Sequence, residues 1–473
     1  MSNPAEHTRN GRSTNPIPFA EPTHIKPSTV EPFTMTTAPL RSFRLNCGTD
    51  HIPLVSALLT AQGFETQDDP LFPKARRLRS GPFALGSSAA ARFGFLYIQD
   101  RSSMLPPLVL APEPGEAVLD MCAAPGGKTS LAADRVGPQG FVLACEPTSS
   151  RMGTLRRNLS LLNLPQTATL GLSAESLPLP AGTPEVGFSR ILLDPPCSGW
   201  GTVDKNPQVV RLWKDDKILP LVLLQRRLLR EAFRLCAPGG TVVYSTCTTN
   251  VRENEEQLQF AVEKLGFVFH PAAPPPGFAF EQALLPEFTG ALRTAPGPDG
   301  QGFFVALLHK PLDAPTPDAP PPIFPHRPAR PPRRPVWEEV PREALESSGC
   351  DPALLPAGPV RSYNGTAHFL PARSLELIPE GVSWKGFPLG KVGPDGRVRV
   401  HPALRCLIPG PDEAENRGAT VLNLEDVAPV EALLRGESLS LSTAASEACL
   451  YFRGLPLCRL SLKNGRAVPP GLF

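Results

Sequence analysis

Residues 117–129 read AVLDMCAAPGGKT and join a short apolar run to a turn built from small residues. From this stretch onward, apolar runs of strand length alternate with helical patterns. Such alternation predicts an α/β fold with a parallel sheet that is covered on both faces. The expected strands are Ala117–Met121, Phe141–Cys145, Ala168–Leu172, Ile191–Asp194 and Thr241–Ser245, with a late edge strand at 302–309. The expected helices are Thr129–Arg135, Ser149–Leu162, Leu219–Leu235 and Glu253–Leu265.

The turn after the first strand is a candidate ligand site, although its residues do not fit a phosphate-binding loop. Its end, Gly127-Lys128-Thr129, is similar to a Walker A motif, but Cys122 stands where that motif needs its first glycine. The glycine fingerprint of dinucleotide-binding folds is also absent. S-adenosylmethionine fits better, because it carries an adenosine and an amino acid but no phosphate. Glu146 ends the second strand, where a carboxylate can bind ribose hydroxyls; the alternative is a surface acid at a strand end.

Two cysteines follow two later strands. Cys197 lies in LLDPPCSG at 192–199, and Cys247 lies in YSTCT at 244–248. Because the two prolines cannot continue a central strand, the chain must leave the sheet at Asp194. Open α/β sheets bind their ligands beyond the carboxyl ends of the strands, so both thiols are expected beside the ligand. The alternative is a pair of packed core cysteines.

Two thiols beside a nucleotide-type pocket suggest covalent chemistry on an electron-poor ring. Carbon C5 of cytosine is a poor nucleophile, but a thiolate that adds to C6 makes the ring enamine-like, so that C5 can attack a sulfonium methyl group. The thiol must be partly ionised, which requires a polar, electropositive setting. A carboxylate at the same turn can accept a hydrogen bond from the exocyclic amine of cytosine.

Together these residues resemble the Sun-type RNA cytosine-C5 methyltransferase family, also called NSUN. The resemblance covers roughly residues 41–310. It rests on DMCAAPGGKT at 120–129, ACEP at 144–147, the two cysteine runs, GFLYIQDRSSM at 94–104 and ENE at 253–255. The tail, with GFPLGKV at 386–392 and GLPLCRL at 454–460, is similar to the carboxyl-terminal RNA-binding domain of the bacterial small-subunit ribosomal RNA methyltransferase F subfamily.

The resemblance implies a Rossmann-like S-adenosylmethionine methyltransferase domain and a role for each motif. Cys247 would be the nucleophile, Cys197 would assist breakdown of the adduct, and Asp194 would orient the cytosine. The implied cofactor-binding residues are Cys122, Ala123, Ala124, Pro125, Gly126, Gly127, Lys128, Glu146 and Asp194. The family's acidic or amide residue near the adenine has no clear counterpart here. Ser173 through its hydroxyl, or Glu175 in a shifted register, could take its place.

Composition and pattern divide the 473 residues into five expected segments. They are a disordered extension at 1–40, a small N-terminal α/β RNA-binding domain at 41–114, the methyltransferase domain at 115–310, a proline-rich linker at 311–359 and a mostly β RNA-binding domain at 360–473. The linker's prolines favour an extended spacer in which no packed core can form. The tail should therefore contribute RNA affinity, and its removal should leave cofactor binding intact.

The bulk numbers exclude several classes of protein. A net charge of +2 gives no overall basic field, so any RNA contact must come from local patches. The ten cysteines form no CxxC pair, which argues against a zinc ribbon or a thioredoxin-type site, and we expect no metal. No apolar run reaches the roughly 18 residues of a membrane span. We expect a cytoplasmic monomer with reduced thiols and no membrane partner.

Several basic or aromatic residues are candidates for RNA contact, with a solvated or packed surface as the alternative. They are Lys74, Arg76, Arg77 and Arg79; Arg226, Arg230 and Arg234 on one helix face; Lys205-Asn206-Pro207; and Trp213. The favoured function is formation of 5-methylcytosine in 16S ribosomal RNA or a small-subunit particle. The alternatives are a transfer RNA cytosine-C5 methyltransferase and a non-catalytic RNA-binding ribosome assembly factor.

Overall fold

The computed structural model describes residues 41–177, 187–212, 217–297, 300–314, 337–347, 349–378, 382–441 and 443–468. The expected extension at 1–40, Trp213 and the most proline-dense part of the linker lie outside the described residues. Among the described residues, no helix combines the length and apolar character that a membrane span needs.

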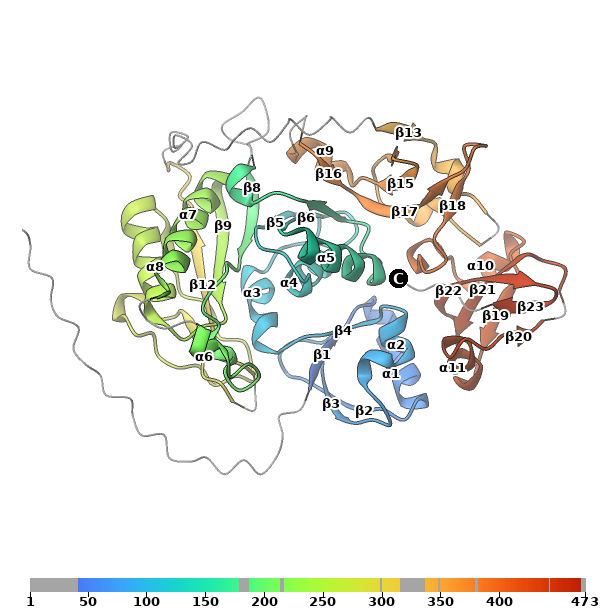
Figure 1. Ribbon diagram of the computed structural model, residues 1–473, viewed down its shortest axis with the longest axis horizontal. Helices are drawn as coiled ribbons and strands as arrows, with labels where there is room; N and C mark the ends of the chain where they lie inside the picture. Colours follow the sequence, from blue (N-terminus) through green and yellow to red (C-terminus); the bar gives the residue numbers. More distant parts are fainter. Residues whose placement is uncertain are drawn as a thin grey trace, which may run out of the picture. The chain divides into compact units, whose positions relative to one another are not determined.

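The central sheet contains five parallel strands in the order β7-β6-β5-β8-β9 (Figure 1). Their bounds are β5 Ala117–Asp120, β6 Phe141–Cys145, β7 Thr167–Leu170, β8 Phe188–Leu193 and β9 Cys236–Thr246. All five predicted strands are confirmed, with ends that differ by a few residues. The strand order changes direction between β5 and β8, because β6 and β7 lie on one side of β5 and β8 and β9 lie on the other. A ligand is expected at the carboxyl ends of the strands at such a switch point.

The prediction of an edge strand at 302–309 is wrong. The strand β12 (Phe303–His309) runs antiparallel to β9 on one side and pairs with β10 (Val268–His270) and β11 (Leu292–Thr294) on the other. Its apolar run is buried on both faces, as in an interior strand, and it lacks the charges that protect an edge.

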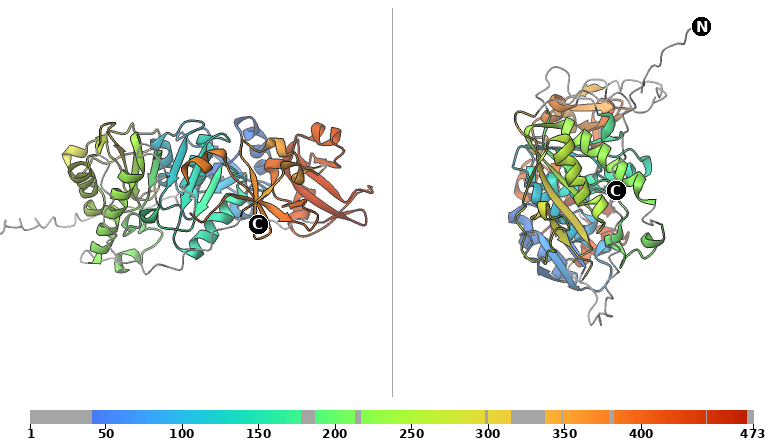
Figure 2. Two further views of the ribbon diagram at one scale, coloured as in Figure 1. Left: turned by 90° about the horizontal axis from the view of Figure 1, so that it is seen from above. Right: turned by 90° about the vertical axis from the view of Figure 1, so that its left-hand side faces the viewer.

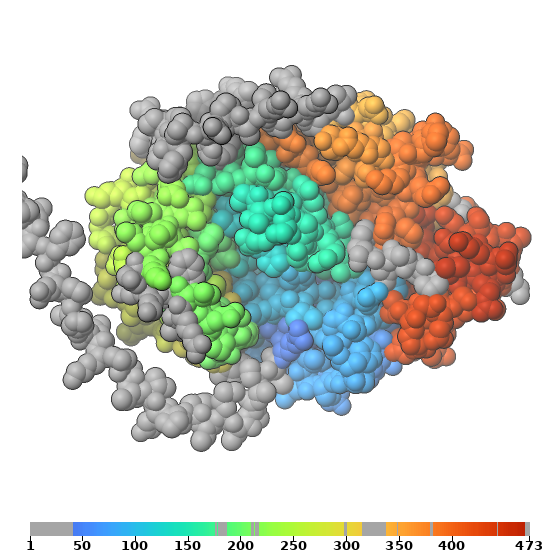
Figure 3. Space-filling model, viewed as in Figure 1, coloured from blue at the N-terminus to red at the C-terminus, as the bar shows by residue number. Residues whose placement is uncertain are grey.

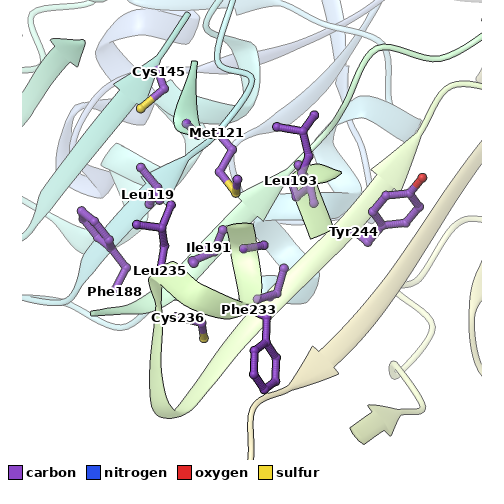
Figure 4. Packing of buried hydrophobic residues seen from close by; sticks show 14 of the residues in the cluster. Leu119, Met121, Cys145, Phe188, Ile191, Leu193, Phe233, Leu235, Cys236 and Tyr244 are labelled. Atoms are coloured by element: carbon purple, nitrogen blue, oxygen red, sulfur yellow. The ribbon is translucent and has the colours of Figure 1, made fainter. Parts of the chain in front are cut away.

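Helices cover both faces of the central sheet, as predicted (Figures 1 and 2). On one face lie α7 (Leu219–Leu235) and α8 (Glu255–Phe260), and Figure 4 shows Phe233 of α7 with Leu119 and Ile191 of the strands. The other face packs α3 (Leu105–Leu110), α4 (Gly127–Val136) and α5 (Ser149–Leu161). Neighbouring strand residues thus enter opposite cores, because side chains alternate across a strand.

The segment before residue 115 forms a four-stranded antiparallel sheet in the order β2-β3-β1-β4. The strands are β1 Ser42–Leu45, β2 Glu65–Asp68, β3 Ala75–Ser80 and β4 Leu96–Ile98, and the helices are α1 Ile52–Ala61 and α2 Ala89–Arg92.

The C-terminal part is mostly β, but it contains two five-stranded sheets with separate cores. In the first sheet the strands follow the order β13 (Glu338–Val340), β14 (Val360–Tyr363), β15 (Thr366–Phe369), β17 (Phe387–Val392) and β18 (Val398–Val400). In the second sheet the strands follow the order β19 (Val421–Leu424), β21 (Glu447–Phe452), β22 (Leu455–Lys463), β23 (Arg466–Val468) and β20 (Leu439–Ser440).

The expectation that no packed core forms between 310 and 359 is wrong for residues after 336. Val340, Leu345, Cys350 and Leu355 are buried with Phe369 in the core of the first C-terminal sheet. The proline-dense stretch ends at Pro335, and the following residues carry enough apolar side chains to pack.

The second C-terminal sheet shares its core with the N-terminal sheet. Leu450 and Phe452 of β21 lie in one buried cluster with Phe43 of β1 and Leu58 of α1. The helix α11 (Ala428–Leu434) contributes Val430 to the same cluster. Segments from the two ends of the chain are therefore packed as one hydrophobic unit, which the expected division into separate domains did not include.

Candidate active site

The predicted catalytic residues gather at the carboxyl edge of the central sheet. Asp120 ends β5, Asp194 follows β8, and Cys247 follows β9. Leu193 pairs with Tyr244 in the parallel register of β8 and β9, so the residues that follow these two positions lie side by side. The prediction that the chain leaves the sheet at Asp194 agrees with the end of β8 at Leu193.

The two thiols form a close pair. The Sγ atoms of Cys197 and Cys247 lie 3.3 Å apart, and both side chains are partly buried. A hydrogen bond from Cys197 lowers the pKa of Cys247, while burial and Asp194 act in the opposite direction. The same bond, together with burial, raises the pKa of Cys197 well above its usual range. The pair therefore favours a thiolate on Cys247, with the Cys197 thiol as its donor.

Asp194 is held from two sides beside this pair. Lys128 Nζ donates to one carboxylate oxygen at 2.8 Å, and Ser245 Oγ donates to the other at 2.8 Å. Although burial lowers the pKa of Lys128, the charge of Asp194 and their hydrogen bond raise it above its ordinary value. The charge of Lys128 also lowers the pKa of Cys247. Each carboxylate oxygen keeps acceptor capacity for a further donor.

A buried network behind the thiols was not predicted as part of the site. The carboxylate of Glu253 accepts from Ser198 N at 2.9 Å, from Ser198 Oγ at 2.5 Å and from Gln225 Nε2 at 3.0 Å. Tyr244 Oη donates to the backbone carbonyl of Glu253 at 2.6 Å. Glu253 thus ties the turn that carries Cys197 to the strand that carries Cys247. The sequence signal was the run ENE, whose first residue forms this network.

The third residue of that run anchors the loop after Cys247. Glu255 forms an ion pair with Arg293 of β11, in which Nη1 donates to both carboxylate oxygens at 2.8 and 2.9 Å, and both side chains are almost fully buried. Arg293 Nη2 also donates to the carbonyl of Thr249 at 2.8 Å. These bonds of Arg293 hold the backbone of the loop after β9 in place.

Close backbone approach fixes the turn after Cys197. Gly201 N donates to the carbonyl of Cys247 at 3.0 Å, and Gly302 N donates to the carbonyl of Gly201 at 2.8 Å. A Cβ atom on Gly201 would lie 2.0 Å from the Gly302 carbonyl oxygen, so only glycine fits here. This contact ties the two cysteine turns together through their backbones.

The glycine-rich loop is supported from the N-terminal segment. A Cβ atom on Gly127 would lie 3.1 Å from Tyr97 and 3.2 Å from Gln99. The buried Arg44 donates to Gln99 Oε1 at 3.1 Å and to Ser130 Oγ at the start of α4. Packing therefore accounts for the small residue at 127, in addition to the ligand approach that we expected.

Glu146 lies at the end of β6, as predicted, and is 1% exposed. Its carboxylate accepts from Thr148 N at 2.8 Å and pairs with Arg151 at 3.1 Å. Arg151 also donates to the carbonyl of Ala124 at 2.8 Å, so it joins Glu146 to the glycine-rich loop. Arg151 was not identified from the sequence. The available signal was its position in the first turn of the helix α5, which follows the acidic residue at the end of β6.

The two alternatives for the residue after β7 interact with each other. Ser173 Oγ donates to a carboxylate oxygen of Glu175 at 3.1 Å, and Glu175 pairs with Arg227 of α7 at 3.2 Å. This pairing directs the Glu175 carboxylate toward α7. The hydrogen bonds that Ser173 and Glu175 form in this turn do not assign the adenine contact to one or the other.

The chemistry of the site fits S-adenosylmethionine. Asp120, Glu146 and Asp194 place three carboxyl groups at adjoining strand ends, which suits a ligand with a sulfonium and an ammonium group and disfavours a pyrophosphate. Burial raises the pKa of Asp120 to about 6, with the charge of Asp194 as a further raising effect. Thr129 Oγ1 donates to Asp120 at 2.7 Å and orients it.

Most basic residues proposed for RNA contact have other partners. Lys74, Arg76 and Arg77 form ion pairs with Asp134, Asp68 and Asp69. Arg226 and Arg230 lie over the ring of Phe260, and Arg234 pairs with Glu231. Lys205 pairs with Asp100, while Asn206, Pro207 and Arg79 are exposed. The basic cluster at 74–79 is therefore largely neutralised.

Comparison with known proteins identifies relatives of the part of the chain that contains the central sheet. The family described as 16S rRNA methyltransferase RsmB/F matches residues 107–309. Ribosomal RNA small subunit methyltransferase F of Salmonella heidelberg is 40% identical over 248 residues, which are 50% of this chain and 49% of that protein. The chain spans about half the length of the curated relatives it matches.

Two solved structures from Pyrococcus horikoshii share the fold. A methyltransferase homolog is 32% identical, with a TM-score of 0.50 over 58% of this chain and 87% of that one. NSun6, crystallised with SFG, is 20% identical, with a TM-score of 0.50 over 59% of this chain and 92% of that one.

Fold and site together define a Rossmann-like methyltransferase whose cofactor is S-adenosylmethionine. The chain belongs to the RsmB/F, or Sun-type, methyltransferase family, which confirms the resemblance found in the sequence.

Proposed function

We propose that this protein methylates carbon C5 of a cytosine in 16S ribosomal RNA through a covalent cysteine adduct. The observation that carries the proposal is the Cys197–Cys247 pair at 3.3 Å beside Asp194. Two adjacent thiols with oppositely shifted pKa values suit a reaction in which one attacks and the other assists release. The RNA substrate is supported by the family description and the curated relatives, whose names specify small-subunit ribosomal RNA.

In the proposed reaction the Cys247 thiolate adds to C6, and the electron pair of the C5–C6 double bond becomes available at C5. The loop at 122–128 and Glu146 would hold S-adenosylmethionine, which would supply the methyl group to C5 and leave as S-adenosylhomocysteine. Asp194 accepts a hydrogen bond from the cytosine edge and orients the ring. A solvent base, positioned with the assistance of Cys197, then takes the C5 proton. The C–H electron pair restores the C5–C6 double bond, and Cys247 leaves as a thiolate.

The target base must leave its stack to reach the two cysteines, because a paired base cannot present C6 to a thiolate. Ser245 and Lys128 already hold Asp194, so the carboxylate needs no rearrangement when the base arrives. The site is thus preorganised for an inserted ring.

Bisulfite sequencing tests the proposal. Small-subunit RNA from a strain without this gene is incubated with the protein and S-adenosylmethionine, both as naked RNA and as assembled particles. One or more cytosines should become resistant to conversion, and the Cys247→Ala protein should leave them unprotected. Absence of new protected cytosines in both substrates would contradict the ribosomal assignment, and the same assay on transfer RNA would test the alternative substrate.

A further inference from the structure

A cavity of about 340 Å³ lies away from the cysteine site, between the methyltransferase sheet and the first C-terminal sheet. Its walls come from α5 and β7 on one side and from β14, β15 and β17 on the other. The short strand β16 (Trp384–Lys385) closes one edge by pairing antiparallel with β7, with Lys385 opposite Thr169. Figure 3 shows the C-terminal atoms, in orange, bordering the blue-green atoms of α5 on one face. The volume lies within the range of small-ligand sites.

Three cations line this cavity without a carboxylate partner among the described residues. Arg156 Nε donates to Thr169 Oγ1 at 2.9 Å, and Lys391 Nζ donates to Thr366 Oγ1 at 2.8 Å. Lys385 Nζ lies 5.7 Å from the centre of the Tyr363 ring. By contrast, Lys74 and Arg77 of the N-terminal segment are neutralised by ion pairs, as described above.

The electrostatic setting of the cavity is consistently positive. Burial lowers the pKa of Lys385, and the charges of Arg156 and Lys391 lower it further. Burial also lowers the pKa of His368 to about 4, with the three cations acting in the same direction. Mutual repulsion of this kind is relieved when an anion binds between the cations.

An aromatic cluster adjoins the cations. The Tyr363 ring lies 5.5 Å from that of Trp337, which in turn lies 6.2 Å from Trp384. Of these three rings, Tyr363 lines the cavity, whereas Trp384 is buried in the core of the central sheet. Cations beside an aromatic ring suit a nucleotide chain, because the cations bind its phosphates.

We propose that this cavity binds a phosphate of the RNA backbone through Arg156, Lys385 and Lys391. The inference rests on the proposed function, because it names a contact for the RNA substrate of that site. Arg156 lies on α5 of the methyltransferase fold and the two lysines lie in the C-terminal part, so one phosphate connects both. The cavity is a binding subsite and takes no part in the chemistry at Cys247.

Lys385→Gln and Lys391→Gln, each in the full chain, test the proposal by titration of a small-subunit RNA fragment at several salt concentrations. Each variant should bind more weakly, and the slope of log affinity against log salt should fall by about 1 for each lost phosphate contact. Lys463→Gln is the matched control. Lys463 is an exposed lysine of β22 outside the cavity, and its substitution removes the same charge. Melting temperature and S-adenosylmethionine affinity report whether each variant is folded.

The outcomes separate this inference from the proposed function. Unchanged RNA affinity and salt slope in both cavity variants, with cytosine methylation intact, would refute the cavity assignment alone. A second outcome concerns free anions. If cytidine monophosphate or inorganic phosphate binds the wild-type protein but neither variant, while all three proteins bind RNA equally well, the cavity is a site for a free anion and the proposal is refuted. A wild-type protein that neither binds nor methylates RNA would refute both proposals.

Discussion

Cys197 and Cys247 are close enough to exchange a proton, yet their proposed roles differ. Cys247→Ala should abolish methyl transfer, because it removes the nucleophile. Cys197→Ala should allow attack and transfer but impair release, so the protein should remain joined to its RNA on a denaturing gel. Loss of rate in Cys197→Ala without a trapped complex would indicate a packing role. Trapping by Cys247→Ala would mean that the nucleophile is Cys197.

The thiol pair also predicts a pH dependence. The hydrogen bond from Cys197 lowers the pKa of Cys247, so Cys197→Ala should raise it. Alkylation of Cys247 by iodoacetamide, followed by mass spectrometry of its peptide, should therefore slow at neutral pH and recover at higher pH. An unchanged pH profile would contradict the assigned donor.

Glu146 offers a test of the cofactor site. Loss of its carboxylate in Glu146→Ala should weaken S-adenosylmethionine binding by about tenfold to a hundredfold, the range expected for charge-assisted hydrogen bonds. Calorimetry measures the affinity, with the exposed Glu437→Ala as a control for net charge. Wild-type melting temperature should rise with S-adenosylmethionine and not with ATP or NAD. An unchanged affinity in Glu146→Ala would remove this residue from the site.

At the scale of elements, the ion pair between α8 and β11 predicts a large stability effect. Glu255→Ala leaves Arg293 charged and buried, and breaking such a pair costs about 3–5 kcal/mol. Denaturant unfolding should show this loss, while the exposed Arg435–Glu437 pair should contribute less than about 1 kcal/mol. The double variant Glu255→Leu with Arg293→Met should recover part of the loss. Equal effects of Glu255→Ala and Glu437→Ala would contradict this assignment.

The elements that the sequence predicted are those with a strong local signal. The runs at 117–119 and 141–145 are continuous and apolar, and Leu219–Leu235 has a long amphipathic pattern. The strand at 303–309 was identified but misplaced, because pairing partners are not local information. The two-residue strand β16 has no periodicity to detect, so its pairing with β7 could not be predicted.

The same distinction holds for the candidate site. Residues 120–129, Asp194 and both cysteines were predicted because each follows a strand with a recognisable motif. Arg151 and Arg44 could not be found this way, since their contacts with Ala124 and Ser130 depend on three-dimensional packing. Family resemblance assigned roles to the cysteines, whereas their 3.3 Å separation required the structure.

For the whole molecule, Arg405 connects three segments that are distant in sequence. Arg405 is half-buried, and its guanidinium donates to the carbonyls of Phe93 at 2.7 Å, Gly94 at 2.9 Å and Leu162 at 3.1 Å. Burial lowers its pKa to about 10. Leu162 follows the C-terminus of α5, where unpaired carbonyls favour a cation. One C-terminal residue therefore stabilises both the N-terminal segment and the methyltransferase sheet.

This arrangement changes the expectation for truncation. The sequence predicted that removing the tail would leave cofactor binding intact, but a chain ending at 336 loses Arg405, the β16 edge strand and the core shared with Phe452. We expect its melting temperature to fall by more than about 5 °C, since each kcal/mol lost shifts the midpoint by a few degrees.

A full chain cut within the proline-rich linker is the control for this truncation. Its two pieces should remain together on gel filtration and keep the melting temperature of the intact protein, because the buried contacts do not depend on the linker. RNA binding by the cut protein should also be retained. A truncated chain that melts like the full protein and binds S-adenosylmethionine normally would show that the shared core contributes little, and that the C-terminal part is an independent domain after all.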